Sequence, residues 1–261
     1  FSVTPSYFSD TLTRGGPQTL IPFGYSLSGQ VDSDSRRKIV VSSFFSFNER
    51  PGVSRTFSPG LTLRLKPQRG LSVSLSPSLT WYSTELQYLR RVDDPAMTAT
   101  YGSRYVFGRI DQKTLACELS VDWALSPRLS LQAYLQPFLS VGAFDRFKEL
   151  ARPRSASYNV YGEGAATVSG GADGYVLDPD GAGPAAAFSL NDPDFNMKSL
   201  RGTVVLRWEY RPGSLLYFVW TQNRADYENP GDLRLGRDLG ALLTAPGDDI
   251  FMLKFTYRFN I

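Results

Sequence analysis

The stretch LSVSLSPSLTWY, residues 71 to 82, alternates between two kinds of side chain without a break. One set is apolar and comprises Leu71, Val73, Leu75, Pro77, Leu79 and Trp81. The residues between them are serines and a threonine, followed by Tyr82. Because successive side chains of a β-strand point to opposite faces of the sheet, this period of two predicts a strand with one apolar and one polar face.

The same alternation recurs along the whole chain. It is present in TLACELSVDWAL (114–125), RLSLQAYLQPFLSV (128–141), RGTVVLRWEY (201–210) and FMLKFTYRFNI (251–261), with shorter versions in FGYSLSGQV, KIVVSSFFSF and SPGLTLRLK. These segments predict about ten strands, an even number that places both chain ends on the same side of an up-and-down sheet.

The connections between the predicted strands come in two lengths. Tight polar turns are expected at 33–36, 66–70, 125–128 and 211–214, and long loops near 85–103, 146–197 and 228–249. Short turns on one side and long loops on the other are typical of an outer-membrane barrel. The predicted fold is therefore all-β: one antiparallel up-and-down transmembrane β-barrel domain over residues 1–261, with short periplasmic turns and long extracellular loops.

One helix is expected in the last long loop. In GRDLGALLTAP (236–246), Leu239, Leu242 and Leu243 share a stripe at helical spacing, and Pro246 ends the segment. A helix of this kind inside a barrel would act as a plug and would support gating.

Composition excludes several kinds of site. The chain has no histidine and one cysteine, Cys117, so Ser-His-Asp and Cys-His catalysis, histidine-ligated metals and an internal disulfide are all ruled out. The net charge of +3 is small and dispersed, which argues against nucleic-acid binding. The sequence DPDG (178–181), with Asp173 nearby, is similar to the start of a calcium loop, but no glutamate follows at the twelfth position, and a polar turn is the better interpretation. No enzymatic activity, cofactor or metal is expected.

A soluble β-sandwich would also alternate, so the pattern leaves two architectures open. The barrel is favoured because one face carries rows of serine and threonine, while leucine and aromatic residues recur on the other face of every strand. In lipid, a closed barrel is the arrangement in which strands pair all of their backbone groups.

Three sets of residues are candidates for roles in such a barrel. Charged residues at polar positions are expected to line the lumen: Arg64, Glu118, Asp122, Arg207, Glu209, Lys254 and Arg258. Aromatic residues near strand ends are expected at the membrane interfaces: Trp81, Trp123, Trp208, Trp220 and Tyr257. The end of the chain resembles the assembly signal of outer-membrane barrels through Lys254, Tyr257, Phe259 and Ile261, although Thr256 stands where glycine is common and Ile261 where an aromatic residue is usual.

Several long segments carry a family resemblance. They are TYGSRYVFGRIDQKTL, LQAYLQPF, FKELARPRS, YNVYG, DPDFNMKSLRGTVVLRWEYRPGSLLYFVWTQNRADYE and GRDLGALLTAPGDDIFMLKFTYRF, and the earlier TRGGPQ and SDSRRK also fit. Together they resemble the C-terminal region of a bacterial family that joins a carbohydrate-binding-like N-terminal domain to an outer-membrane β-barrel domain of uncharacterised function. The resemblance implies an integral outer-membrane location and brings no catalytic residues. It also implies that the chain is a fragment lacking that N-terminal domain, and that the intact barrel has more strands.

Two functions remain open from the sequence. The first is a porin-like conduit, or the membrane anchor of a glycan-binding protein. The second is a scaffold subunit of a larger outer-membrane assembly with a closed lumen. The expected partners are outer-membrane lipid and lipopolysaccharide, the barrel assembly machinery, and other outer-membrane or periplasmic subunits. The basic residues of FKELARPRS, which are Lys148, Arg152 and Arg154, are either lipopolysaccharide contacts or solvated loop charges.

Overall fold

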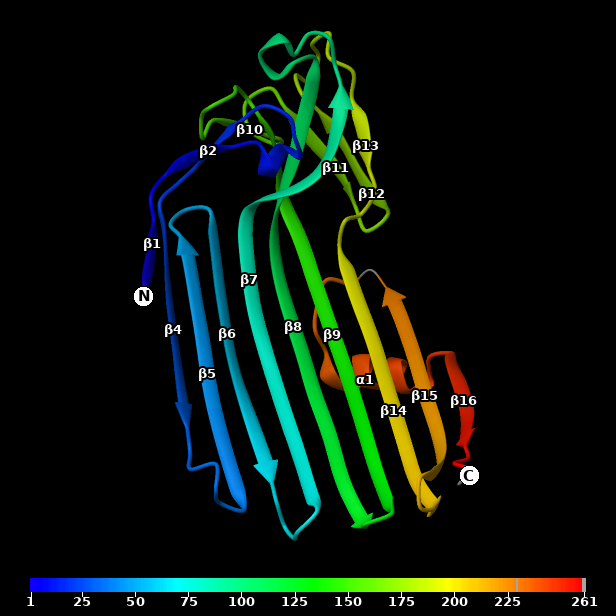
Figure 1. Cartoon of the computed structure of the whole chain (residues 1–261). Coiled ribbons are helices and arrows are strands. Elements are labelled where there is room, and N and C mark those ends of the chain that lie inside the picture. Colours follow the sequence, from blue (N-terminus) through cyan, green and yellow to red (C-terminus); the bar gives the residue numbers. More distant parts are fainter. Residues whose placement is uncertain (229, 260–261) are drawn as a thin grey trace.

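The computed structural model describes residues 1–228 and 230–259, and within them the chain is built mainly of antiparallel β-strands. The main sheet follows the order β1-β4-β5-β6-β7-β8-β9-β14-β15-β16, with β10 paired to β9 (Figure 1). Its strands are β1 (Ser2–Thr4), β4 (Gly24–Asp32), β5 (Ile39–Arg50), β6 (Ser54–Leu65), β7 (Leu71–Asp93), β8 (Ser103–Ser126), β9 (Leu129–Leu150), β10 (Tyr158–Val160), β14 (Phe195–Arg211), β15 (Ser214–Glu228) and β16 (Gly247–Thr256). The predicted all-β antiparallel fold is confirmed.

Four short connections lie together at one end of the sheet, which we call the turn end. They are residues 33–38, 66–70, 127–128 and 212–213. One further short connection, residues 51–53 between β5 and β6, lies at the opposite end. At the opposite end, part of the expected loop 85–103 is strand, because β7 continues to Asp93 and β8 begins at Ser103. Register shifts between Thr84 and Gln87 and between Tyr88 and Arg90 explain the difference. Each shift changes which residues share a face, so the strict alternation on which the prediction depended is lost there.

The register assigns the side chains of the sheet to two faces. Leu75 lies opposite Leu119, and Leu119 opposite Leu135, so the apolar sets of β7, β8 and β9 coincide. We call this side the apolar face. Between the turn end and the bulges it carries the odd-numbered residues of β4–β9 and β16 and the even-numbered residues of β14 and β15. The other residues form the polar face.

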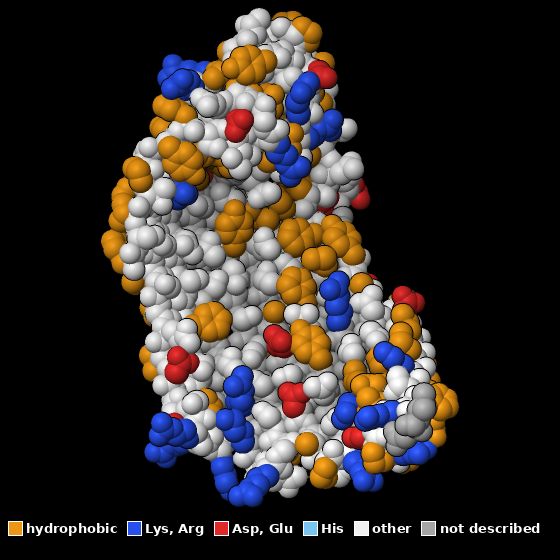
Figure 2. All heavy atoms as spheres, in the orientation of Figure 1, with side chains coloured by type: hydrophobic (Ala, Val, Ile, Leu, Met, Phe, Trp, Pro, Cys, Tyr) orange, Lys and Arg blue, Asp and Glu red, His pale blue; other side chains and the backbone are white. Residues whose placement is uncertain are grey.

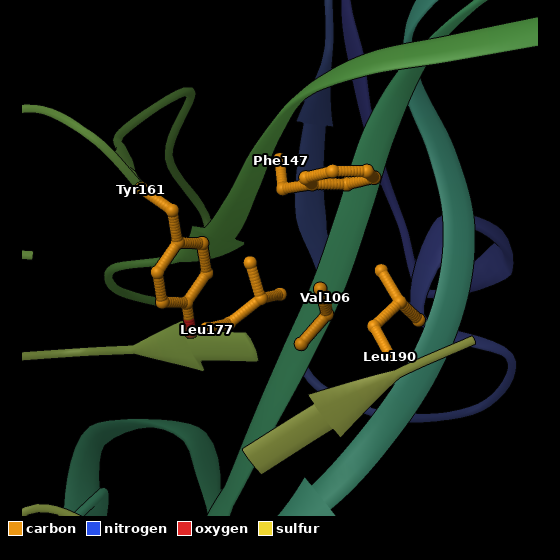
Figure 3. Packing of buried hydrophobic residues seen from close by; sticks show 5 residues of the cluster. All are labelled: Val106, Phe147, Tyr161, Leu177 and Leu190. Carbon is orange, nitrogen blue, oxygen red and sulfur yellow. The ribbon is translucent and has the colours of Figure 1, made fainter. Parts of the chain in front are cut away.

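The end of the molecule opposite the turn end, which we call the head, contains most of the buried core. It consists of the far ends of β7, β8 and β9, β10, the pair β2 (Tyr7–Ser9) and β3 (Thr19–Ile21), the short helices η1 (Thr11–Thr13) and η2 (Thr98–Thr100), and a small sheet of β11 (Thr167–Gly171), β12 (Gly174–Asp178) and β13 (Phe188–Leu190). In Figure 3, Leu177 and Leu190 of the small sheet approach Val106 and Phe147 of β8 and β9.

A second cluster unites Phe107 and Leu150 with Leu12 of η1, so the extended strands are covered by both the small sheet and the N-terminal segment.

The predicted helix is present as α1 (Leu235–Thr244), and its last turn precedes Pro246 as expected. The expectation that it is a plug is wrong. Leu242 packs against Leu139 and Leu200, which both belong to the apolar face. In addition, no helix within the described ranges is long and apolar enough to cross a membrane.

The two ends of the main sheet are its open edges. β1 pairs with β4 and β16 pairs with β15, and no pairing between β1 and β16 is present in the described part of the chain. The last strand is also shorter at its C-terminal end than the alternation of 251–261 predicts. Thr256, which pairs with Leu215 near the start of β15, is the last residue of β16. Ile261, a member of the expected assembly signal, lies outside the described residues.

Candidate functional site

The apolar face carries large apolar side chains that the described part of the chain leaves exposed. The exposed members are Leu27, Val31, Ile39, Val41, Phe45, Phe57, Leu61, Leu75, Trp81, Leu125, Leu135, Trp208, Phe218, Phe251, Leu253 and Phe255. Leu253 retains 69% of its accessible surface. These residues extend over neighbouring strands from β4 to β16, and a contiguous exposed apolar surface of this kind marks a site of interaction.

The same face is free of charge over a defined band, which we call the apolar band. In strand order it covers the apolar-face positions of 39–47, 57–65, 71–81, 115–125, 129–143, 200–208, 216–220 and 251–255. None of these positions holds Asp, Glu, Lys or Arg. Charged residues appear on this face only beyond the band, for example Arg55 in β6 and Asp226 in β15.

All four tryptophans lie on the apolar face. Trp123 and Trp208 lie next to the turn end, while Trp81 and Trp220 are the last band residues of β7 and β15 on the side of the head. Trp81 lies opposite Lys113, which is ten residues before Trp123 in β8. With a rise of about 3.3 Å per residue, this spacing corresponds to about 33 Å along the strand.

The polar face has a different surface. Hydroxyl groups bond across strands, with 3.0 Å between the Ser58 and Thr80 oxygens and 2.9 Å between those of Thr114 and Ser140. Figure 2 looks onto this face, where uncharged polar side chains and backbone cover a broad area, several hydrophobic side chains lie across the middle, and charged groups lie both toward the turn end and in the head.

Most of the charged residues that the sequence analysis selected share the polar face. The register places Arg64, Glu118, Asp122, Arg207, Glu209 and Lys254 on it. Asp122 accepts a hydrogen bond from Gln132 Nε2 at 3.1 Å. Arg258 follows β16, and its backbone N–H donates to Ser214 Oγ at 3.0 Å.

Tyr257, expected at a membrane interface, and Phe259, expected in the assembly signal, both follow β16. Their rings lie 4.7 Å apart between centroids, and the Arg211 guanidinium stands over the Tyr257 ring at 5.3 Å. The end of the chain is thus tied to the neighbouring β14–β15 turn.

The head contains a buried charge network that the sequence analysis missed. Arg104 Nη1 donates to Glu149 Oε1 at 2.6 Å, and Arg104 Nη2 lies 2.7 Å from Asp94 Oδ2. Tyr161 Oη donates to the second Glu149 oxygen at 2.7 Å. The side chains of Arg104 and Glu149 are only 8% and 3% exposed. Burial and the adjacent Glu149 carboxylate raise the pKa of Tyr161 well above its usual range, so its phenol stays neutral and donates.

The basic segment FKELARPRS is largely structural. Lys148 is buried, and its Nζ donates to Glu85 Oε2 at 2.7 Å. Arg154 stands over the Phe8 ring at 4.6 Å and thereby holds β2. Lys148 is therefore not the loop charge that the sequence suggested, because β9 extends through this region to Leu150 and carries it into the head.

The DPDG segment forms a polar turn. Asp178 Oδ1 accepts hydrogen bonds from the N–H groups of Asp180, at 3.2 Å, and Gly181, at 2.9 Å. Within residues 1–228 and 230–259, no group of three or more Cys, Asp or Glu side chains is arranged to hold a metal ion.

Comparisons with known proteins give one family. The profile of the family described as "Domain of unknown function (DUF5916)" matches residues 7–260. Neither the curated proteins nor the solved structures give a match.

Replacing Glu149 tests the charge network. In Glu149→Gln, Arg104 remains buried and loses one of its two carboxylates, so we expect the free energy of local unfolding of the head to fall by about 3 kcal/mol. Amide hydrogen exchange at 103–108 and 147–150 measures this change. Glu163→Gln, an exposed position in the same region, is the matched control, and equal exchange in the two variants would contradict a stabilising role.

Proposed function

Since the chain belongs to the family described as "Domain of unknown function (DUF5916)", a description that names no function, we propose a function from its structure. The chain forms the wall of a transmembrane β-barrel in a bacterial outer membrane. It acts without catalysis, as a conduit or as the membrane anchor of a glycan-binding protein. The observation that carries this proposal is the apolar band, an exposed and uncharged surface on strands whose opposite face is polar.

A lipid bilayer explains the band better than a protein partner does. At the strand tilt of about 40° that outer-membrane barrels have, the length of about 33 Å between the levels of Trp81 and Trp123 gives a height of about 25 Å, which is the apolar height of such barrels. Trp208 and Trp220 are closer in level, because Trp208 lies opposite Leu216, four residues from Trp220. Alternation of lipid-facing and lumen-facing residues also explains why, at the level of the band, charged residues such as Glu118 and Arg207 lie on the polar face only. A soluble partner would have to present an apolar surface that matches every strand of the main sheet from β5 to β16.

Hydrogen bonding supports closure of the wall. In lipid every backbone N–H and C=O must be paired within protein, so both open edges of the sheet need strand partners. Strand direction alternates along the sheet, which makes β1 antiparallel to β16. Val3 pairs with Tyr25 and so belongs to the same side as Leu253. We therefore propose that β1 and β16 pair directly in the membrane.

A scaffold subunit with a closed lumen is the second candidate. It is favoured by the small sheet of the head, which packs on Val106, an even-numbered residue of β8 and thus on the side of the polar face. Covering one end of the lumen in this way restricts passage. The anchor or conduit remains the first proposal because the polar face presents hydroxyl groups and charges rather than a packed core.

Arginine placed on either face of one strand tests the membrane assignment. Leu119 and Ser120 are neighbours in β8 on opposite faces. Leu119→Arg puts a charge in the middle of the band, and we expect it to lower the free energy of unfolding in lipid vesicles by about 2 to 4 kcal/mol. Ser120→Arg, the control, is expected to lower this free energy much less. Equal losses would contradict a lipid-facing band.

Ion selectivity tests conduction. We expect single-channel currents from the folded protein in planar bilayers, and Arg207→Glu should shift the reversal potential in a salt gradient toward cation preference, because a lumen charge changes sign. Arg36→Glu, in a turn outside the strands, should leave the potential unchanged. Absence of current from folded, inserted protein would favour the scaffold function.

Cross-linking tests the closure. Val3→Cys combined with Leu253→Cys in a Cys117→Ala background should give a disulfide within one chain in vesicles. Phe251→Cys and Phe255→Cys, two residues away on the same side, define the register. A cross-link between two chains, or none in all three pairs, would contradict direct pairing of β1 with β16.

A further inference from the structure

The apolar band is not equally tall on all strands. In β8 it comprises six alternate residues, from Leu115 to Leu125. In β15 it comprises three, from Leu216 to Trp220, and beyond Trp220 the same face continues with Gln222 and Arg224. The band of β16 has three as well. In a bilayer of uniform thickness, the apolar face of β15 and β16 would therefore place polar groups within the hydrocarbon region.

Helix α1 lies over that region. Leu242 is 1% exposed and packs with Leu139 and Leu200 on the apolar face. Arg224, which lies beyond the apolar run of β15, donates from Nη1 to the Leu243 carbonyl at 2.7 Å and to the Ala245 carbonyl at 3.2 Å. The end of the helix thus binds one of the polar side chains that follow the shorter band.

The N-terminal half of α1 is fixed by a buried carboxylate. Asp238 is fully buried and accepts hydrogen bonds from Asn196 Nδ2 at 3.1 Å and from the Arg234 backbone N–H at 2.8 Å. Arg237 Nε donates to it at 2.7 Å. Because both ends of the helix are bonded to the sheet or to its own flank, its outward side chains have defined directions.

Those outward side chains form an apolar stripe. Leu235, Leu239 and Leu243 follow at intervals of four and are 50%, 39% and 64% exposed. Thr244 follows Leu239 by five residues, which at about 100° per residue is one full turn and about 140° more. It therefore lies on the opposite flank of the helix. Figure 1 shows α1 running across the strands, so strands that cross a membrane hold this helix near the membrane plane.

We propose that α1 is an interfacial helix whose stripe of Leu235, Leu239 and Leu243 inserts among lipid acyl chains and completes the apolar band on the side of β14–β16. The inference rests on the proposed membrane location of the sheet. An amphipathic helix lying in the interface plane with its apolar side in the acyl region is a known mode of membrane contact. The occupant of the stripe is lipid, because α1 packs on the apolar face through Leu242, so that its exposed leucines lie on the same side of the sheet as the apolar band.

Fluorescence in vesicles tests this assignment on the full chain. Single cysteines at Leu239, Thr244 and Leu119, each in a Cys117→Ala background, carry a polarity-sensitive dye, and phosphatidylcholine with nitroxide on its acyl chain serves as quencher. We expect blue-shifted emission and strong quenching for Leu239→Cys, and water-like emission with little quenching for Thr244→Cys.

The third position separates two ways to fail. If the dye at Leu119 is quenched while the dyes at Leu239 and Thr244 behave alike, the sheet is in lipid and the assignment of α1 is wrong. If the dye at Leu119 is unquenched as well, the membrane location fails and the assignment of α1 fails with it. A dye at Leu239 that is shielded from water but unquenched by lipid would indicate a protein contact and would also overturn the proposal.

Discussion

Backbone pairing between long neighbouring strands is the constraint on which the rest of the structure depends. Once Leu75 is opposite Leu119 and Leu119 opposite Leu135, the face of each remaining residue of these strands is fixed as far as the bulges. A shift of one residue in any pair would exchange serines for leucines across a whole strand. The apolar band, the polar face and the position of the tryptophans are all consequences of this one register.

The same pairing explains why the molecule has two unlike parts. In the head, bulges change the faces of β7 and β9, and the strands there are covered on both sides by β11–β13 and by the N-terminal segment. That part can bury charges such as Arg104 and Glu149 because each finds a partner. Toward the turn end the sheet is a single layer. In the described part of the chain, its apolar face is covered only where α1 packs on β9 and β14, on the side of the head. A single layer with an uncovered apolar face is stable only where something other than water meets that face.

Much of the sheet could be predicted from the sequence because its signal is local. The strands and the turn end could be predicted from the strict alternation in segments such as 71–82 and 114–125 and from the turn residues between strands. Helix α1 could be predicted from the leucine spacing and Pro246. What could not be predicted depends on distant contacts. Arg104 and Glu149 are 45 residues apart, and neither neighbourhood has a pattern that pairs them. Leucine spacing shows that a helix has an apolar stripe, but it cannot show that Leu242 packs on the apolar face of the sheet, with the result that a plug was expected.

The boundary of the apolar band provides a final argument, because charged side chains begin just beyond it. Lys198 belongs to the apolar face, is fully buried, and donates from Nζ to Asp226 Oδ2 at 2.7 Å and to Glu228 Oε2 at 3.0 Å. Asp249 accepts from Trp220 Nε1 at 2.8 Å at the same boundary. Charges that are present on one side of a line and absent on the other define a step in polarity. Such a step is what the border between hydrocarbon and head groups requires of a protein surface, since an unpaired charge is costly within the hydrocarbon and is solvated again beyond it.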